Sequence, residues 1–156
     1  MGYAKQIKTC IQDYLEKENW AYTFDEEQAL FSVKIKLEGR LNQCELAICI
    51  REDHYIVYAE IAISANENCL SLVSEYLHRV NFGLKRGAFE LDFNDGEIRY
   101  KICVDCGDEC DSMPSESVIA RSIKIPCMMF EQYGDGLLGV IFGNLTPPEA
   151  FDLSVD

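Results

Sequence analysis

Three consecutive segments of the chain alternate apolar and polar residues with a period of two. Apolar side chains occupy every second position in residues 31–38, 44–50 and 55–63. Turn residues separate these segments, with Gly39 after the first and residues 51–54 after the second. This alternation is typical of strands with one buried and one wet face, and short turns join antiparallel neighbours. The sequence therefore predicts an antiparallel sheet that is covered on one side.

Amphipathic patterns predict three helices around these strands. Apolar residues recur at helical spacing in residues 3–18 and 67–82, and Asn66 is the expected N-cap of the second helix. Residues 115–143 have a mixed helical pattern, which Pro126 should split into two pieces.

Two further regions are expected to be extended. Residues 20–24 form a short strand, and residues 89–93 and 98–104 form the arms of a hairpin whose turn is Asn94-Asp95-Gly96. The expected order is therefore α-β-β-β-β-α-β-β-α. We predict an α+β fold in which the helices pack on one face of an antiparallel sheet.

The composition limits the classes of partner. The chain has 156 residues, which suits a single α+β domain over residues 1–156, with a frayed tail at 152–156. Its 27 Asp and Glu residues outnumber 14 Lys and Arg residues, so the net charge is −13. Such a charge repels phosphate groups, and we expect neither nucleic acid nor membrane as a partner. The N-terminal residues carry charges throughout, unlike a signal peptide, so we predict a cytoplasmic location.

A cluster of cysteines provides the main candidate metal ligands, and His54 or His78 could complete a site with them through space. Cys103, Cys106 and Cys110 follow C-x₂-C-x₃-C spacing, which resembles half of a zinc site, but no second pair of cysteines completes it. Neighbouring acidic residues should raise the pKa values of these thiols and oppose redox reactivity. We predict free thiols with no metal and no cofactor, and zinc binding stays open as an alternative.

No catalytic constellation is recognisable in the sequence. The chain has no G-x-G-x-x-G, G-x-x-x-x-G-K-[ST] or G-x-S-x-G motif. Its two histidines, His54 and His78, are more typical of surface positions than of general bases. We therefore expect a protein that is not an enzyme.

Three apolar side chains are candidates for contact with a partner. Ile56 and Tyr58 interrupt the polar face of their strand, and Tyr22 lies in the short strand near the first helix. An apolar patch of this kind on a sheet can bind another protein or peptide segment. It can equally form the interface of a homodimer, and the sequence leaves the choice open.

One segment resembles a known family. Residues 80–101, V-N-F-G-L-K-R-G-A-F-E-L-D-F-N-D-G-E-I-R-Y-K, resemble the YbjN-like family of bacterial sensory transduction regulators. The family pattern matches Asn81, the G-x-F-E-x-D motif at 87–92, Gly96 and the I-x-[FY]-[RK] strand at 98–101. The closing segment of the family resembles residues 139–151, so the resemblance spans nearly the whole chain.

The resemblance implies a fold and a class of function. Members are similar in fold to type III secretion chaperones, which are small, acidic and often dimeric proteins that bind segments of other proteins. It implies a non-catalytic regulatory or protein-binding module, or alternatively a chaperone for a client segment. It also implies that Asn81 and Gly87 set the helix-to-strand turn, and it transfers no catalytic residue.

Overall fold

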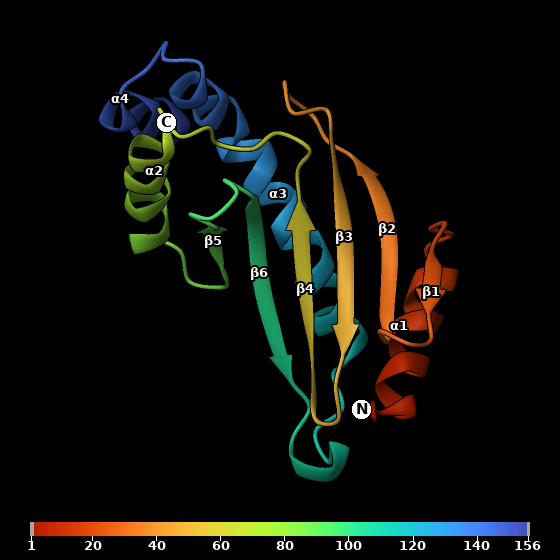
Figure 1. Cartoon of the computed structure of the whole chain (residues 1–156). Coiled ribbons are helices and arrows are strands. Elements are labelled where there is room, and N and C mark those ends of the chain that lie inside the picture. Colours follow the sequence, from red (N-terminus) through yellow and green to blue (C-terminus); the bar gives the residue numbers. More distant parts are fainter. Residues whose placement is uncertain (1, 156) are drawn as a thin grey trace.

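A six-stranded antiparallel sheet forms the centre of the protein, whose computed structural model describes residues 2–155 (Figure 1). The spatial order of the strands is β1-β2-β3-β4-β6-β5. The first four strands form a meander, and after the second helix the chain returns to the sheet as the β5–β6 hairpin, in which β6 pairs with β4 and β5 lies at the edge. The strands are β1 (Thr23–Asp25), β2 (Leu30–Lys36), β3 (Gln43–Ile50), β4 (His54–Glu60), β5 (Ala88–Leu91) and β6 (Ile98–Asp105).

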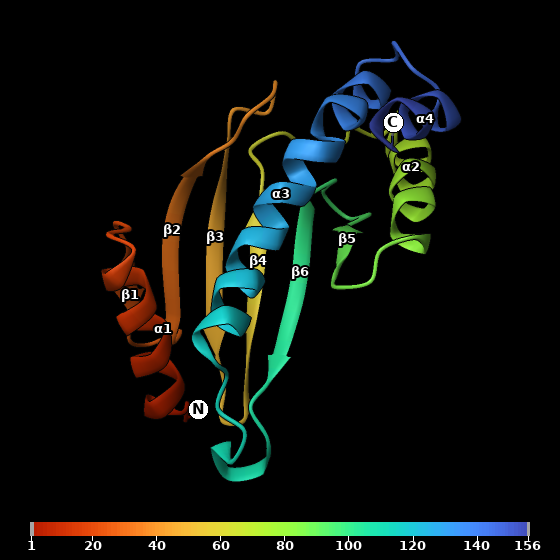
Figure 2. The ribbon, with the colours of Figure 1, turned by 180° about the vertical axis from the view of Figure 1, so that it is seen from behind.

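The longest helix, α3, runs diagonally across one face of this sheet. Figure 2 shows α3 and α1 on the same side of the strands, whereas α2 lies beside β5 and packs with α4 and the end of α3. No helix among residues 2–155 covers the opposite face, which Figure 1 presents to the viewer. The predicted α+β class and element order are confirmed, with two additions, η1 and α4. The helices are α1 (Lys5–Lys17), α2 (Leu70–Phe82), the 3₁₀ turn η1 (Asp108–Cys110), α3 (Glu116–Ile141) and α4 (Pro147–Val155).

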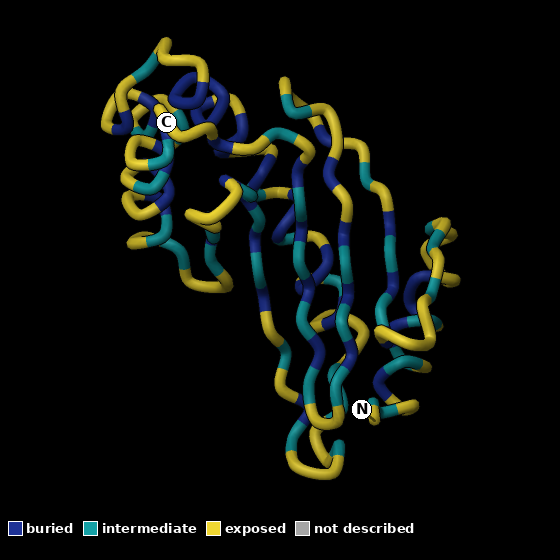
Figure 3. The backbone as a smooth tube through the Cα atoms, in the orientation of Figure 1, coloured by how far each residue is buried: buried dark blue, intermediate teal, exposed yellow. Residues whose placement is uncertain are grey.

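The hydrophobic core lies between the sheet and the helices. One central row of the core joins Ile48, Val57 and Ile102 across three strands, in the expected alternation of inward and outward residues. Phe89 and Tyr100 are buried in this core and pack edge to face, with ring centroids 4.9 Å apart. Figure 3 shows this alternation along β3 and β4, where buried and more exposed residues follow each other.

The predicted break in the third helix is wrong, because α3 is one helix of 26 residues with Pro126 inside it. Packing explains this result, since Pro126 is itself buried and α3 presses its apolar side on the sheet. A buried hydrogen bond of 2.8 Å between Tyr55 in β4 and Ser122 in α3 ties the two layers together. These contacts offset the hydrogen bond that a proline removes from a helix interior.

Three smaller expectations are also corrected. Asn66 caps only the turn that precedes α2, where its side chain accepts from the backbone N–H of Asn68 at 2.9 Å. Phe93 does not continue the hairpin arm, because β5 ends at Leu91 and Phe93 is 58% exposed. The expected frayed tail is helical as far as Val155, and residue 156 lies outside the described residues.

Within residues 2–155, no helix is both long and apolar enough to cross a membrane.

Candidate protein-binding site

The uncovered face of the sheet has a half-buried apolar strip at its centre. Ile56 lies between Cys49 of β3 and Cys103 of β6 in neighbouring strands. Tyr58 lies in the next outward row, between Ala47 and Lys101. The outward direction of the candidates Ile56 and Tyr58 is therefore as expected from the alternation.

Charged side chains border this strip and partly cover it. The Arg99 guanidinium lies 4.2 Å from the centre of the Tyr58 ring, which is a cation–π contact. Glu90 accepts from Arg99 at 2.7 Å and from Lys101 at 2.8 Å. Partial burial raises the pKa of Glu90, but the hydrogen bonds from these two cations outweigh burial, so its pKa is lowered overall. Tyr58 is thus held in a network within the sheet.

The third candidate, Tyr22, lies elsewhere. Its hydroxyl donates to Glu16 of α1 at 2.7 Å, and its ring packs edge-on against the fully buried Phe31, with centroids 5.5 Å apart. Phe31 faces the helices, so Tyr22 helps to fix α1 on the sheet. The structure therefore does not bring Tyr22 together with Ile56 and Tyr58.

Beside the uncovered face, β6 extends beyond its neighbour β5. Pairing between β5 and β6 stops at Ala88 opposite Lys101, whereas β6 continues to Asp105. Among the described residues 2–155, the stretch 102–105 therefore has β4 on one side and no strand on the other. A strand edge of this kind presents unpaired backbone groups that can template another strand.

The backbone groups that face this open edge belong to Cys103 and Asp105. The N–H of Cys106 donates across the sheet to Asp53 at 2.7 Å, toward β4. Successive residues of a strand direct their backbone groups to opposite neighbours, so Cys103 and Asp105 point away from β4. Within residues 2–155, no other backbone group forms a hydrogen bond with the N–H and C=O groups of Cys103 and Asp105 that face the open edge. Both residues are exposed.

The adjacent edge, that of β5, is closed by a side chain. Asn81, near the end of α2, accepts from the N–H of Phe89 at 2.8 Å and donates to its carbonyl at 2.9 Å. The amide thus takes the place of a neighbouring strand for β5. This pair of bonds gives a physical role to the Asn81 of the sequence motif.

The loop before β5 is held away from the line of the strand. Gly87 has φ +74°, and a Cβ atom there would lie 2.5 Å from the carbonyl oxygen of Lys101. The hydroxyl of Tyr100 donates to the carbonyl of Arg86, which fixes the loop just before this glycine. Because the chain turns at Gly87, the loop does not pair with residues 102–105.

The cysteine cluster is spread over different environments. Cys103 is exposed on the uncovered face, Cys106 is fully buried, and the Cys110 thiol donates to the carbonyl of Glu52 at 3.2 Å. In the described part of the chain, no group of three or more His, Cys, Asp and Glu side chains is arranged to hold a metal ion.

The pKa values of Cys103 and Cys106 are raised, which is the expected direction, but for a different main reason. Burial is the largest cause of the raised pKa of Cys103 and raises that of Cys106 to about 11, with Asp105 adding to both. Desolvation, rather than the charge of the acidic loop, is therefore the main cause of these raised pKa values. Outside the cluster, Cys44 and Cys127 meet in the core with their sulfur atoms 4.0 Å apart, which their sequence positions do not reveal.

Comparison with known proteins adds no relative: no family model matches the sequence, and neither does any curated protein. The YbjN-like resemblance stays a prediction.

The open edge is the part of the site that sequence reasoning missed, although a signal for it exists. Counting outward from the turn at 94–96 pairs Leu91 with Ile98 and Ala88 with Lys101. Gly87 then ends the first arm while the second arm continues, so unequal arms of a hairpin indicate the unpaired stretch.

Proposed function

We propose that this protein is a non-catalytic protein-binding module that receives an extended segment of another protein as an added strand on β6. The observation that carries the proposal is the pair of outward backbone groups at Cys103 and Asp105, which lie on an exposed edge beside an uncovered face. Main-chain hydrogen bonds provide affinity in such strand addition, and neighbouring side-chain sites provide specificity.

The uncovered face extends the same surface. Ile56 adjoins Cys103 in the neighbouring strand, so a segment that pairs with β6 lies close to the apolar strip. A role as a sensory regulator of the YbjN-like kind, or as a chaperone for a client segment, is compatible with this mode of binding. We infer the regulatory or chaperone role from the resemblance alone, and the binding mode from the strand edge.

The test uses a proline at the open edge. Peptides selected from a random display library on the intact protein are measured against Cys103→Pro and the matched control Cys103→Ser. Proline removes the outward N–H without removing a bond to β4, and edge strands tolerate proline. We expect binding to Cys103→Ser to match that of the original protein, and binding to Cys103→Pro to fall about tenfold or more, which is about 1.4 kcal/mol.

Two outcomes would contradict the proposal. Selected peptides that bind Cys103→Pro as tightly as Cys103→Ser do not use this edge. A dimer in sedimentation that dissociates on Cys103→Pro substitution would assign the edge to a second copy of the chain.

A further inference from the structure

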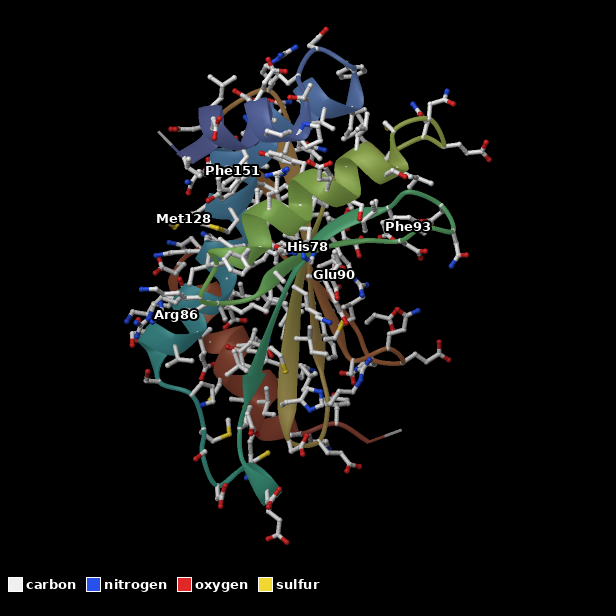
Figure 4. The ribbon with its side chains drawn as sticks, turned by 90° about the vertical axis from the view of Figure 1, so that its left-hand side faces the viewer. His78, Arg86, Glu90, Phe93, Met128 and Phe151 are labelled. Carbon is white, nitrogen blue, oxygen red and sulfur yellow. The ribbon has the colours of Figure 1, made fainter. Side chains whose placement is uncertain are left out.

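The open edge of β6 forms one wall of a groove, here called the edge groove. The groove has a volume of about 540 Å³ and lies between β6, the loop that precedes β5 and the first half of α3. The loop contributes Lys85 and Arg86, and α3 contributes Val118, Arg121 and Ile125. Figure 4 shows Arg86 beside this part of α3.

The charge of the edge groove is opposite to that of the whole protein. Three cations, Lys85, Arg86 and Arg121, line it with one carboxylate, Asp105, although the chain has 27 acidic and 14 basic residues. Asp105 already accepts from the N–H of Gly107 at 2.9 Å. Within residues 2–155, no carboxylate lies within salt-bridge distance of the three cations, and all three are exposed. The groove is therefore a cationic site, in which three cations face one carboxylate that forms no ion pair with them.

The helix side of the groove also offers apolar contact. Val118 and Ile125 are seven residues apart on α3 and so lie along one face of the helix. Val118 is 36% exposed, and Ile125 is half-buried. Alternate side chains of a strand added to β6 point toward this helix, because residues along a strand face opposite sides in turn.

We propose that the edge groove binds an extended segment rich in both acidic and apolar residues, contributed by a partner protein. Its carboxylates meet Lys85, Arg86 and Arg121, and its apolar side chains contact Val118 and Ile125. This assignment rests on the proposed strand addition and names the class of partner for it. A second copy of the chain does not fit as well, because a symmetric pairing of edges brings the two sets of cations together.

The test uses a fluorescein-labelled peptide, acetyl-Glu-Thr-Val-Thr-Glu-Thr-Val-Thr-Glu-amide, in which one alternate set of side chains carries both Glu and Val, and its binding to the intact protein is followed by fluorescence anisotropy. The variant Arg121→Glu reverses a charge in the groove, and Lys124→Glu makes the same change on an exposed residue of α3 that does not line it. We expect affinity to fall about tenfold for Arg121→Glu and to stay within about twofold for Lys124→Glu. Rising salt concentration should weaken binding.

Modified peptides separate the two levels of the proposal. N-methylation of one alternate set of residues should abolish binding, and methylation of the other set should not, because only one set faces β6. A second peptide has Lys in place of each Glu. If it binds as tightly as the acidic peptide and shows the same dependence on N-methylation, the proposed acidic class of partner is wrong, but strand addition stands. If neither set matters, strand addition is wrong and the inference with it. Absence of binding by the acidic peptide up to millimolar concentration also overturns the inference.

Discussion

Replacing Asn81 by alanine tests whether a side chain closes the edge of β5. The substitution removes two hydrogen bonds, of 2.8 and 2.9 Å, between the amide and the backbone of Phe89. Each hydrogen bond contributes about 1 kcal/mol net to the free energy of unfolding, and a buried backbone group that is left unpaired costs more. Phe89 is only 4% exposed, so water reaches these groups poorly. We expect Asn81→Ala to lower the free energy of unfolding by about 2–3 kcal/mol.

Urea unfolding followed by far-UV circular dichroism measures this loss. For a chain of this length, it corresponds to a fall in Tm of about 5–10 °C. The matched control is Asn94→Ala in the exposed hairpin turn, which should change stability by less than about 0.5 kcal/mol. Asn81→Asp retains the acceptor for the Phe89 N–H but loses the donor to its carbonyl, so it should be destabilised as well. A loss below about 0.5 kcal/mol for Asn81→Ala would refute the role assigned to Asn81.

Three other perturbations have expected outcomes. Gly87→Ala should destabilise in urea unfolding by more than Gly143→Ala, because both glycines have positive φ but only Gly87 has a backbone oxygen 2.5 Å from the added Cβ; equal losses would contradict the close approach. In thiol titration of the native protein at pH 8, Cys103→Ser should remove a fast-reacting thiol, whereas Cys106→Ser should not, since Cys106 is buried and its pKa is about 11. Glu90→Gln should lower stability at pH 7 and make progressively less difference as the pH falls below about 4, because the folded-state pKa of Glu90 is below its unfolded value of about 4.3; a difference that does not change with pH would show that the carboxylate charge is not involved.

The strands and their faces follow closely from the sequence. Period-two alternation in 31–38, 44–50 and 55–63 predicts the meander, and it also predicts that Ile56 and Tyr58 point away from the core. This succeeds because alternation is a local property of an extended chain and one buried face fixes the register.

The errors arise where tertiary packing overrides a local preference. Pro126 is a helix breaker by itself, yet α3 continues through it because Ile123, Cys127 and Phe130 hold that side of the helix in the core against the sheet. Apolar character alone groups Tyr22 with Ile56, but the Tyr22 ring faces Phe31 and its hydroxyl reaches α1. Neither packing arrangement is encoded in the spacing of nearby residues.

The candidate site divides in the same way. The unequal lengths of the β5 and β6 arms could be counted from the hairpin turn. The edge groove could not be predicted from the sequence. Lys85 and Arg86 come close to Arg121 only because α3 crosses over the sheet.

The central claim is that residues 102–105 of β6, which extend beyond the end of β5, form a free edge that another protein segment can occupy. Amide hydrogen exchange of the isolated protein, resolved by residue with NMR, tests this claim without a partner. We predict fast exchange at Cys103 and Asp105, and slow exchange at Ile102 and Val104, which bond to β4, and at Phe89, which bonds to Asn81. Protection of Cys103 and Asp105 equal to that of Ile102 and Val104 would show that the edge is covered and would contradict the claim.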